Sequence, residues 1–355
     1  MFETSEIIEK TKIQNPKSKI NFGVIGCGWV ARDYGIPAIQ NAENAQLIAV
    51  CDTNFDNLQK IEPENQRLLR TENLDEFLAC EELEAVYIAT PNDSHRRLTE
   101  KCAAAGKHVL CEKPMAIRYA DAAAMILACA ENRVQYATAF DQRFQARHLR
   151  LKSLIETGVL GAISSIKIHY ACWLPADWCA DNWRIDREIA GGGAFIDLAP
   201  HGIDLAQFLI GEKLIDFACF FQHKIHGYKV DDGAAAIGKF ADETLFSLNV
   251  AYNCPDEFPR RTLEIVGTKA MARATNTMGQ TAGGELVLID ASGAQTFVAV
   301  EDADDVSPFQ RQIEVFSQSL LDGKPFPFAP AQDLATMRIV ASVLENEKLK
   351  VESGK

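Results

Sequence analysis

One short turn restricts the fold of this chain more than any other feature. It consists of Gly26, Cys27, Gly28, Trp29, Val30 and Ala31. The turn follows the apolar run 20–25 and opens a helical pattern that continues to about residue 42. In such a strand–turn–helix unit the first glycine permits a tight turn, the second lets the backbone approach a pyrophosphate, and the small last residue allows close packing. A plain glycine turn between strand and helix would look similar, so further residues must decide whether a nucleotide binds.

Asp52 supplies that further evidence, because it ends the second apolar run, 46–51. A carboxylate in this position can accept hydrogen bonds from the ribose hydroxyls of adenosine. Its charge would repel a ribose 2′-phosphate, and residues 53–57 contain no arginine or lysine to attract one. We therefore expect a dinucleotide site that prefers NAD over NADP.

The first part of the chain repeats one rhythm, in which short apolar runs alternate with helical patterns. The runs cover residues 20–25, 46–51, 67–71, 85–90, 107–111 and 134–140. Strands that are apolar throughout and separated by helices predict a parallel sheet covered on both faces. We interpret 20–142 as a Rossmann nucleotide-binding domain and the polar residues 1–19 as an N-terminal extension.

The rhythm changes near residue 142. A helix is expected at 144–157, a buried one at 194–210, and two closing helices at 308–321 and 331–349. Strands are expected at 163–172, 214–225, 234–240, 244–252, 261–267, 285–290 and 294–300. This order predicts an α+β domain over 143–355, built on a large, mostly antiparallel sheet. The whole chain is therefore expected to have an α/β fold with a second α+β domain for substrate binding and oligomerisation.

Composition excludes several classes of partner. The formal net charge of −13 makes nucleic acid and anionic membrane surfaces unsuitable partners. No run approaches the ~18 apolar residues of a membrane span, and the first residues lack the core of a signal peptide. The ten cysteines include no C-x-x-C pair and sit in apolar runs, which indicates reduced thiols, a cytoplasmic protein and no metal site.

The segment GGGAFIDLAPHGID at 191–204 carries three polar side chains on a helix that is otherwise apolar. Asp197, His201 and Asp204 lie at i, i+4 and i+7, so they share one face. A neutral imidazole is suited to removing a hydroxyl proton, and Asp197 can orient the ring or raise its basicity. Taken singly, His201 would more often be a satisfied core histidine, and Asp197 could be a buried cap. Asp204 could orient His201 or bond the backbone, and the sequence leaves both open.

Other candidates come from loops and strand ends. Lys113 follows the run 107–111, where the carboxyl end of a parallel strand faces the ligand crevice, and its ammonium group can stabilise a developing alkoxide. Arg143 and Arg184 could contact substrate or tie loops together. The aromatic cluster of Trp173, Trp178 and Trp183 could face a sugar ring or serve packing.

Several motifs together resemble the GFO/IDH/MocA oxidoreductases, the family of glucose–fructose oxidoreductase and inositol dehydrogenase. The motifs are GCGWVA, ATPNDSH (89–95), AGKHVLCEKPMA (105–116), DQRF (141–144), WRIDREIAGGGAFIDLAPHGID (183–204) and PFQRQIEVF (308–316). The resemblance covers nearly all of the chain from residue 20. Two departures concern the shape of the pocket: Asp141 stands where relatives often have asparagine, and Ala199-Pro200 replaces a step that commonly contains glycine.

The resemblance implies roles for individual residues. The lysine of its Glu112-Lys113-Pro114 motif reaches substrate beside the nicotinamide, and its acid–histidine pair falls on Asp197 and His201. The residues it places along the cofactor are Thr90, Pro91, Asn92, His95 and Glu112.

The implied activity is hydride transfer between NAD(P) and a secondary alcohol of a sugar, cyclic polyol or amino-sugar derivative. The implied assembly is a homodimer or homotetramer joined through the C-terminal sheet. Two alternatives remain, a catalytically silent protein that binds NAD or sugar and an NAD-dependent glycosidase.

Overall fold

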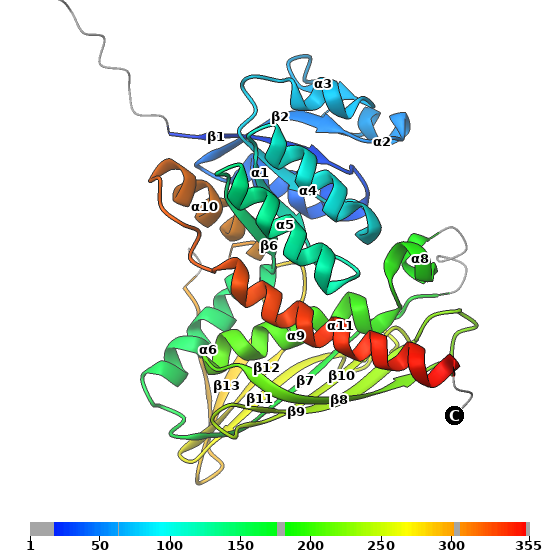
Figure 1. The fold of residues 1–355 in the computed structure, drawn as a ribbon. Coiled ribbons are helices and arrows are strands. Elements are labelled where there is room, and N and C mark those ends of the chain that lie inside the picture. Colours follow the sequence, from blue (N-terminus) through cyan, green and yellow to red (C-terminus); the bar gives the residue numbers. More distant parts are fainter. Residues whose placement is uncertain (1–17, 63, 176–181, 302–305, 353–355) are drawn as a thin grey trace, which may run out of the picture.

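The computed structural model describes residues 18–62, 64–175, 182–301 and 306–352 (Figure 1). Most of the predicted extension 1–19 lies outside these ranges, as does Trp178. The described chain forms a six-stranded sheet and an eight-stranded sheet, each with its own helices.

The six-stranded sheet is wholly parallel, as the sequence predicted. Its strands, in the spatial order β3-β2-β1-β4-β5-β6, are Leu69–Thr71, Ala45–Cys51, Ile20–Ile25, Ala85–Ile88, His108–Glu112 and Tyr136–Ala139. The order reverses beside β1, between β2 and β4. Ligands bind at such a switch point, outside the carboxyl ends of the strands.

Helices cover both faces of this sheet, which is why its strands are apolar throughout. They are η1 (a π-helix, Ala31–Gly35), α1 (Ile36–Asn41), α2 (Phe55–Gln59), α3 (Leu74–Leu78), α4 (His95–Ala104) and α5 (Tyr119–Glu131), with 3₁₀ turns η2 (Asn92–Ser94) and η3 (Asp141–Phe144). Asparagine side chains cap two of them: Asn54 accepts from the N–H of Asp56 before α2, and Asn73 does the same for α3.

The eight-stranded sheet has the order β14-β13-β12-β11-β7-β10-β9-β8. These strands are Gln295–Phe297, Glu285–Asp290, Ala270–Thr275, Arg261–Gly267, Ile163–Ala171, Leu245–Ala251, Gly233–Phe240 and Leu214–Gln222. Only the pair β7–β10 is parallel, so the prediction of a mostly antiparallel sheet is confirmed. Strand β12 was not predicted. Its sequence AMARAT contains few strand-favouring residues, and pairing with β11 and β13 outweighs that local preference.

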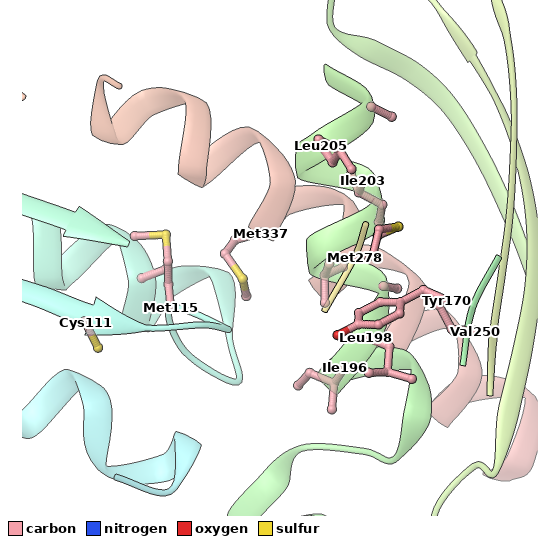
Figure 2. Packing of buried hydrophobic residues seen from close by; sticks show 14 of the residues in the cluster. Cys111, Met115, Tyr170, Ile196, Leu198, Ile203, Leu205, Val250, Met278 and Met337 are labelled. Carbon is pink, nitrogen blue, oxygen red and sulfur yellow. The ribbon is translucent and has the colours of Figure 1, made fainter. Parts of the chain in front are cut away.

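Three helices lie over one face of this sheet, and α9 is the central one: α6 (Ala146–Glu156), α9 (Ala194–Ile210) and α11 (Pro330–Glu352) (Figure 1). The short η4 (Trp183–Ile185) and α8 (Arg187–Ala190) lead into α9. Figure 2 shows Ile203 and Leu205 of α9 in one cluster of buried residues with Met115 from the first domain and Met337 from α11. The core is therefore continuous between the domains, and α9 lies at their junction.

Helix α10 (Pro308–Leu321) packs on the first domain, although the sequence pattern predicted it as part of the second domain, 143–355. Its buried residues Phe309, Ile313 and Phe316 belong to the core cluster that also contains Phe22 of β1 and Ile39 of α1. The chain thus returns to the nucleotide-binding domain after completing the second sheet, and the boundary at residue 142 does not separate all the packing.

Candidate active site

A cavity of about 550 Å³ lies at the carboxyl ends of the parallel strands, and the glycine-rich turn forms part of its wall. Gly26 has φ of +88°, a conformation that side chains rarely adopt, and a Cβ there would come within 2.7 Å of the carbonyl oxygen of Ala89. A Cβ on Gly28 would meet nothing within 4 Å, so the backbone beside it is open to a ligand. This space fits the pyrophosphate of a dinucleotide at the start of the following helix.

Asp52 lines the same cavity and is held in place by the turn. Its Oδ2 accepts from the N–H of Cys27 at 2.6 Å, and its Oδ1 accepts from the N–H of Asn54 at 2.8 Å. The fixed carboxylate is therefore presented where ribose hydroxyls could donate to it. Thr53 and Arg97 also line the cavity, so one arginine from α4 does face this space.

The predicted cofactor loop between β4 and α4 is only partly exposed to the cavity. Thr90 and Pro91 line it, whereas the amide of Asn92 donates to the carbonyl of Ala190 at 2.9 Å and so ties the loop to α8. His95 has no accessible surface, and its ring nitrogens contact the carbonyls of Thr90 and Pro114. The ring therefore holds two neighbouring loops together and does not face the cavity, and the predicted place of His95 along the cofactor stays a prediction.

A second, smaller cavity of about 80 Å³ adjoins the first, since both are lined by Gly28, Ala89, Thr90 and Trp183. Its other lining residues are Trp29, Val30, Asn92, Glu112, Lys113, Arg184 and Asp197. The structure thus gathers the glycine-rich turn, the lysine motif and the first turn of α9 around one space. Cys27 is buried behind the turn, with a pKa raised to about 12 by burial and the nearby Asp52.

Lys113 and Asp197 form an ion pair between the two domains. Lys113 Nζ donates to Asp197 Oδ1 at 2.7 Å and to the backbone carbonyl of the same residue at 2.9 Å, while Tyr252 Oη donates to Asp197 Oδ2 at 2.8 Å. Burial acts to raise the pKa of Asp197, but Lys113 and Arg184 hold it well below its usual range. Asp197 therefore fixes the lysine, and its hydrogen bonds go to Lys113 and Tyr252 rather than to the ring of His201.

His201 instead lies beside Asp141. Its Nδ1 is 3.4 Å from Asp141 Oδ1 and has no hydrogen-bond partner among the described residues. The edge of the ring packs against Tyr170 with centroids 5.7 Å apart. Burial and the charge of Lys113 lower the pKa of His201 well below its ordinary value, although Asp197 opposes them. The imidazole is therefore neutral at neutral pH, as a general base must be.

Asp204 takes neither of the two roles considered for it. It pairs with Arg143, which donates through Nε at 2.8 Å and through Nη2, and the same guanidinium bonds Asp333 Oδ1 at 2.7 Å. All three side chains are at most 3% exposed. Of the two roles predicted for Arg143, the structure supports that of a tie between segments, because the side chain is 3% exposed and lines neither cavity.

Arg184 does face the cavity. Its guanidinium lies 4.5 Å from the ring centroid of Trp183 and 6.0 Å from that of Trp29, and it lines the same cavity as Lys113 and Asp197. Trp173 packs edge-on against His226 and lines neither cavity. The tryptophans that the sequence grouped together therefore have different surroundings.

Three residues that fix α9 or its polar side chains were not predicted. Asp231 accepts from the N–H groups of Gly193 and Phe195, both at 2.7 Å, and so caps α9. A Cβ on Gly193 would come within 2.0 Å of the Asp231 carbonyl, which explains that glycine. Tyr252 and Asp333 are the other two. The two adjacent acids before Gly233 could have drawn attention to Asp231. No local sequence pattern marked Tyr252 or Asp333.

Comparison with known proteins identifies the family. Residues 20–140 match the oxidoreductase family with an NAD-binding Rossmann fold, and residues 148–273 match the GFO/IDH/MocA C-terminal domain. The chain belongs to the GFO/IDH/MocA oxidoreductases. The resemblance stated from the motifs is thereby confirmed, and so are the fold class and the assignment to NAD(P)-dependent oxidoreductases.

Relatives in this family use both dinucleotides. A 1,5-anhydro-D-fructose reductase from Ensifer adhaerens is 26% identical over 94% of this chain and 99% of its own length. A D-xylose 1-dehydrogenase [NADP(+)] from Haloarcula marismortui is 26% identical over 59% of this chain and 58% of its own.

The WlbA dehydrogenase from Bordetella pertussis, solved with NADH and UDP-GlcNAcA, is 25% identical with a TM-score of 0.77. The match covers 93% of this chain and 97% of WlbA.

The described residues also bear on membrane spans and metal sites. No helix among them is long and apolar enough to cross a membrane. No group of three or more His, Cys, Asp or Glu side chains among them is arranged to hold a metal ion.

Proposed function

We propose that this GFO/IDH/MocA oxidoreductase interconverts a secondary alcohol and a ketone on a sugar, cyclic polyol or amino-sugar derivative. The observation that carries the proposal is the ion pair of Lys113 with Asp197, which spans the two domains in the wall of a cavity next to the nucleotide cavity. A lysine fixed there can donate to the reacting oxygen. The relatives named as sugar dehydrogenases and reductases support the same substrate class.

The chemistry divides between two side chains. Lys113, held in place by its ion pair with Asp197, hydrogen-bonds the substrate oxygen and stabilises its negative charge in the transition state. His201, neutral in its buried position, takes the hydroxyl proton during oxidation and returns one during reduction. The bound dinucleotide supplies the acceptor or donor of the hydride. Arg184, above Trp183, is positioned to contact polar groups of the substrate.

The nucleotide is expected to lie along the turn 26–31, past Thr90 and Pro91, with its nicotinamide end toward Glu112 and Lys113. NAD is proposed to bind better than NADP, because the carboxylate of Asp52 faces the place of the ribose hydroxyls. The relatives do not decide this preference, since both dinucleotides occur among them.

One experiment separates the proposal from the two alternatives. The protein is mixed with NAD or NADP and a panel of sugars and polyols, and reduced nucleotide is followed by absorbance. Net formation with at least one secondary alcohol is expected, and Lys113→Met should abolish it. Lys101→Met, an exposed lysine 3.6 Å from Asp75, is the matched control.

The other outcomes each contradict dehydrogenase function. Tight nucleotide binding without turnover across the panel would favour the silent binding protein. Cleavage of aryl glycosides that requires NAD but accumulates no NADH would favour the glycosidase.

Assembly through the eight-stranded sheet is part of the proposal. Its face opposite α9 carries Phe220, Ile237 and Leu245, which are 75%, 64% and 59% exposed. Apolar side chains gathered on an open sheet favour burial against another copy. Light scattering at micromolar concentration should give a dimer or tetramer mass, and a monomer mass would contradict this.

The free thiols of the described chain favour a reducing compartment, so we propose the cytoplasm, which cell fractionation would test.

A further inference from the structure

Asp141 is a buried acid to which neither the family motifs nor the mechanism above gives a role. It begins η3, two residues after the last residue of β6, and is 2% exposed. Its Oδ2 accepts from the side-chain amide of Gln142 at 2.8 Å. Its Oδ1 points to His201 Nδ1 at 3.4 Å.

The histidine side of this contact is incomplete. Nδ1 of His201 is buried and lacks a hydrogen-bond partner among the described residues, which is costly for a polar atom. The ring is 7% exposed, so its small accessible surface lies away from Nδ1. A small rotation of the ring would shorten 3.4 Å to the 2.7–3.2 Å that is usual for such a bond. Asp141 is the carboxylate in position to complete it.

The charged groups around this pair come from several elements. Lys113 and Glu112 reach it from the end of β5, and Asp197 lies one turn earlier on α9. Tyr170 faces it from β7. Tyr87 of β4 is hydrogen-bonded to Glu112, and the side-chain amide of Gln142 lies on the Asp141 side. The opposite charges of Lys113 and Asp197 compensate each other. The ionisable groups that remain without a compensating charge are the carboxyls of Glu112 and Asp141 and the imidazole of His201.

Burial and the neighbouring Glu112 raise the pKa of Asp141 to about 7, although Lys113 opposes them. Burial and Lys113 lower the pKa of His201. Asp141 is therefore a group that can change its protonation near neutral pH while the imidazole remains neutral. A pair coupled in this way titrates as a unit.

We propose that Asp141 is the positioning residue of His201, selecting its tautomer and storing the substrate proton. This rests on the proposed function of His201 as the base. When Asp141 is ionised, it accepts a hydrogen bond from Nδ1–H, and Nε2 is free to take a proton. When Asp141 is protonated, it donates to Nδ1, and Nε2 carries the proton that a reduction needs.

The proton balance is complete. During oxidation the C–H bond breaks and its hydride leaves to the bound dinucleotide, the hydroxyl proton passes to Nε2, and the Nδ1 proton passes to Asp141 Oδ1. The imidazole ends neutral and the carboxyl ends protonated. Reduction reverses each transfer. The two directions therefore need opposite protonation states of Asp141, so alcohol oxidation should rise and ketone reduction should fall through a pH near 7.

The kinetic test compares pH profiles of kcat in both directions for the native enzyme, Asp141→Asn and Asp141→Glu. Asparagine keeps the shape but cannot store the proton, so the limb near pH 7 should disappear and kcat for oxidation should fall about 10²-fold at pH 8. KM and nucleotide affinity should stay within about twofold, since Asp141 does not touch ligand. Asp141→Glu should restore a limb in the pH profile of kcat, because glutamate can again bind and release the proton. Asp75→Asn, at an exposed acid on α3, is the control and should change nothing.

A second measurement does not depend on turnover. Proton–nitrogen NMR of labelled histidine follows the two ring nitrogens of His201, assigned by their loss in His201→Gln. The native protein should change tautomer with a midpoint near pH 7, and Asp141→Asn should hold one tautomer throughout. A tautomer that ignores pH in the native protein, or a kinetic limb that survives in Asp141→Asn, would overturn the proposal. An NMR switch without turnover of any alcohol would instead contradict the proposed function.

Discussion

Two clusters of buried charge lie along the single helix α9, and they differ in how completely their polar atoms are bonded. Near its start, Asp197 pairs with Lys113, and His201 lies beside Asp141. One turn beyond His201, Asp204 joins Arg143 and Asp333 in a closed group. Each cluster joins α9 to other segments, and each contains a cation and two carboxylates. We call the cluster of Lys113, Asp197, His201 and Asp141 the open cluster, and that of Arg143, Asp204 and Asp333 the closed cluster.

In the closed cluster, both oxygens of Asp204 are bonded by one guanidinium and the side chains are at most 3% exposed. In the open cluster, Lys113 and Asp197 keep 14% and 24% of their side-chain surface beside a cavity, and His201 Nδ1 has no partner. Charge alone does not separate the two, because each contains a cation and two carboxylates. The unused bonding capacity marks the cluster that can act on a ligand.

The largest expected effect is on turnover, from removing the base of the open cluster. His201→Ala should lower kcat by about 10²–10⁴-fold, the usual contribution of a positioned acid–base group, and abolish the pH limbs. Nucleotide affinity should be nearly unchanged, because the ring lines neither cavity. Steady-state kinetics with nucleotide titration measures both.

The matched control is His148, a fully buried histidine with both ring nitrogens bonded, to the Gln142 carbonyl and Thr277 Oγ1. His148→Ala should lower stability while leaving kcat per folded molecule within a few-fold. A fully active His201→Ala enzyme with an unchanged pH profile would show that the two clusters do not differ in function.

The next largest effect is expected on stability, when the cation of the closed cluster is removed. Arg143→Met leaves Asp204 and Asp333 buried without their cation, and the free energy of unfolding should fall by about 3–5 kcal/mol. Arg273→Met removes an exposed pair with Glu264 and should cost about 0–1 kcal/mol. Urea denaturation at pH 7 measures both. Equal losses for the two variants would mean that the closed cluster adds no more than a surface pair.

This contrast also explains what the sequence could predict. The turn 26–31, Asp52 and the alternation of strands and helices are local patterns, and each has its expected place in the structure. Helical periodicity placed Asp197, His201 and Asp204 on one face of α9. It could not say what that face meets, because Arg143 and Tyr252 are 61 and 55 residues distant from the acids they bond.

The same limit applies to His95 and Asp141. The motif marked His95 as part of the cofactor loop, but only packing shows that its ring is enclosed between two carbonyls. Asp141 was noticed as a departure from the family pattern, yet nothing in the sequence related it to His201, 60 residues later, because the contact depends on how η3 docks on α9. Local patterns predict elements, whereas partners across the domain junction come from tertiary packing.

A smaller effect should appear in the pH dependence of stability. The pKa of Asp141 is raised to about 7 in the folded protein, above ~3.9 for an unfolded aspartate. The folded state therefore binds the extra proton between these values, and stability declines as pH rises from ~4 to ~7. Asp141→Asn lacks this decline, so it should be more stable than the native protein by on the order of 1–3 kcal/mol at pH 8. Denaturation at several pH values tests this, and a difference independent of pH would contradict the raised pKa.

The smallest effect concerns Asp52. The protein bonds its carboxylate only in part, so in this respect Asp52 stands between the two clusters. The backbone N–H groups of Cys27 and Asn54 hold it, yet it still lines the nucleotide cavity. Its remaining acceptor capacity should favour ribose hydroxyls over a 2′-phosphate, so NADH should bind at least ~10-fold tighter than NADPH, about 1.4 kcal/mol. Asp52→Ser with Thr53→Arg should narrow or reverse this gap by replacing a repulsive charge with an attractive one.

Fluorescence titration of both nucleotides measures the preference, with Asp56→Ser on the exposed surface of α2 as the control for loss of an acid nearby. The control should keep the native ratio, because its carboxylate does not line the cavity. Equal affinities in the native protein would mean that Asp52 is fully used by the turn, as Asp204 is by Arg143, and would place it with the structural charges. If the native protein prefers NADH and only the double variant removes this preference, Asp52 belongs with the ligand-binding charges. Its free lone pairs then face a ligand rather than the protein.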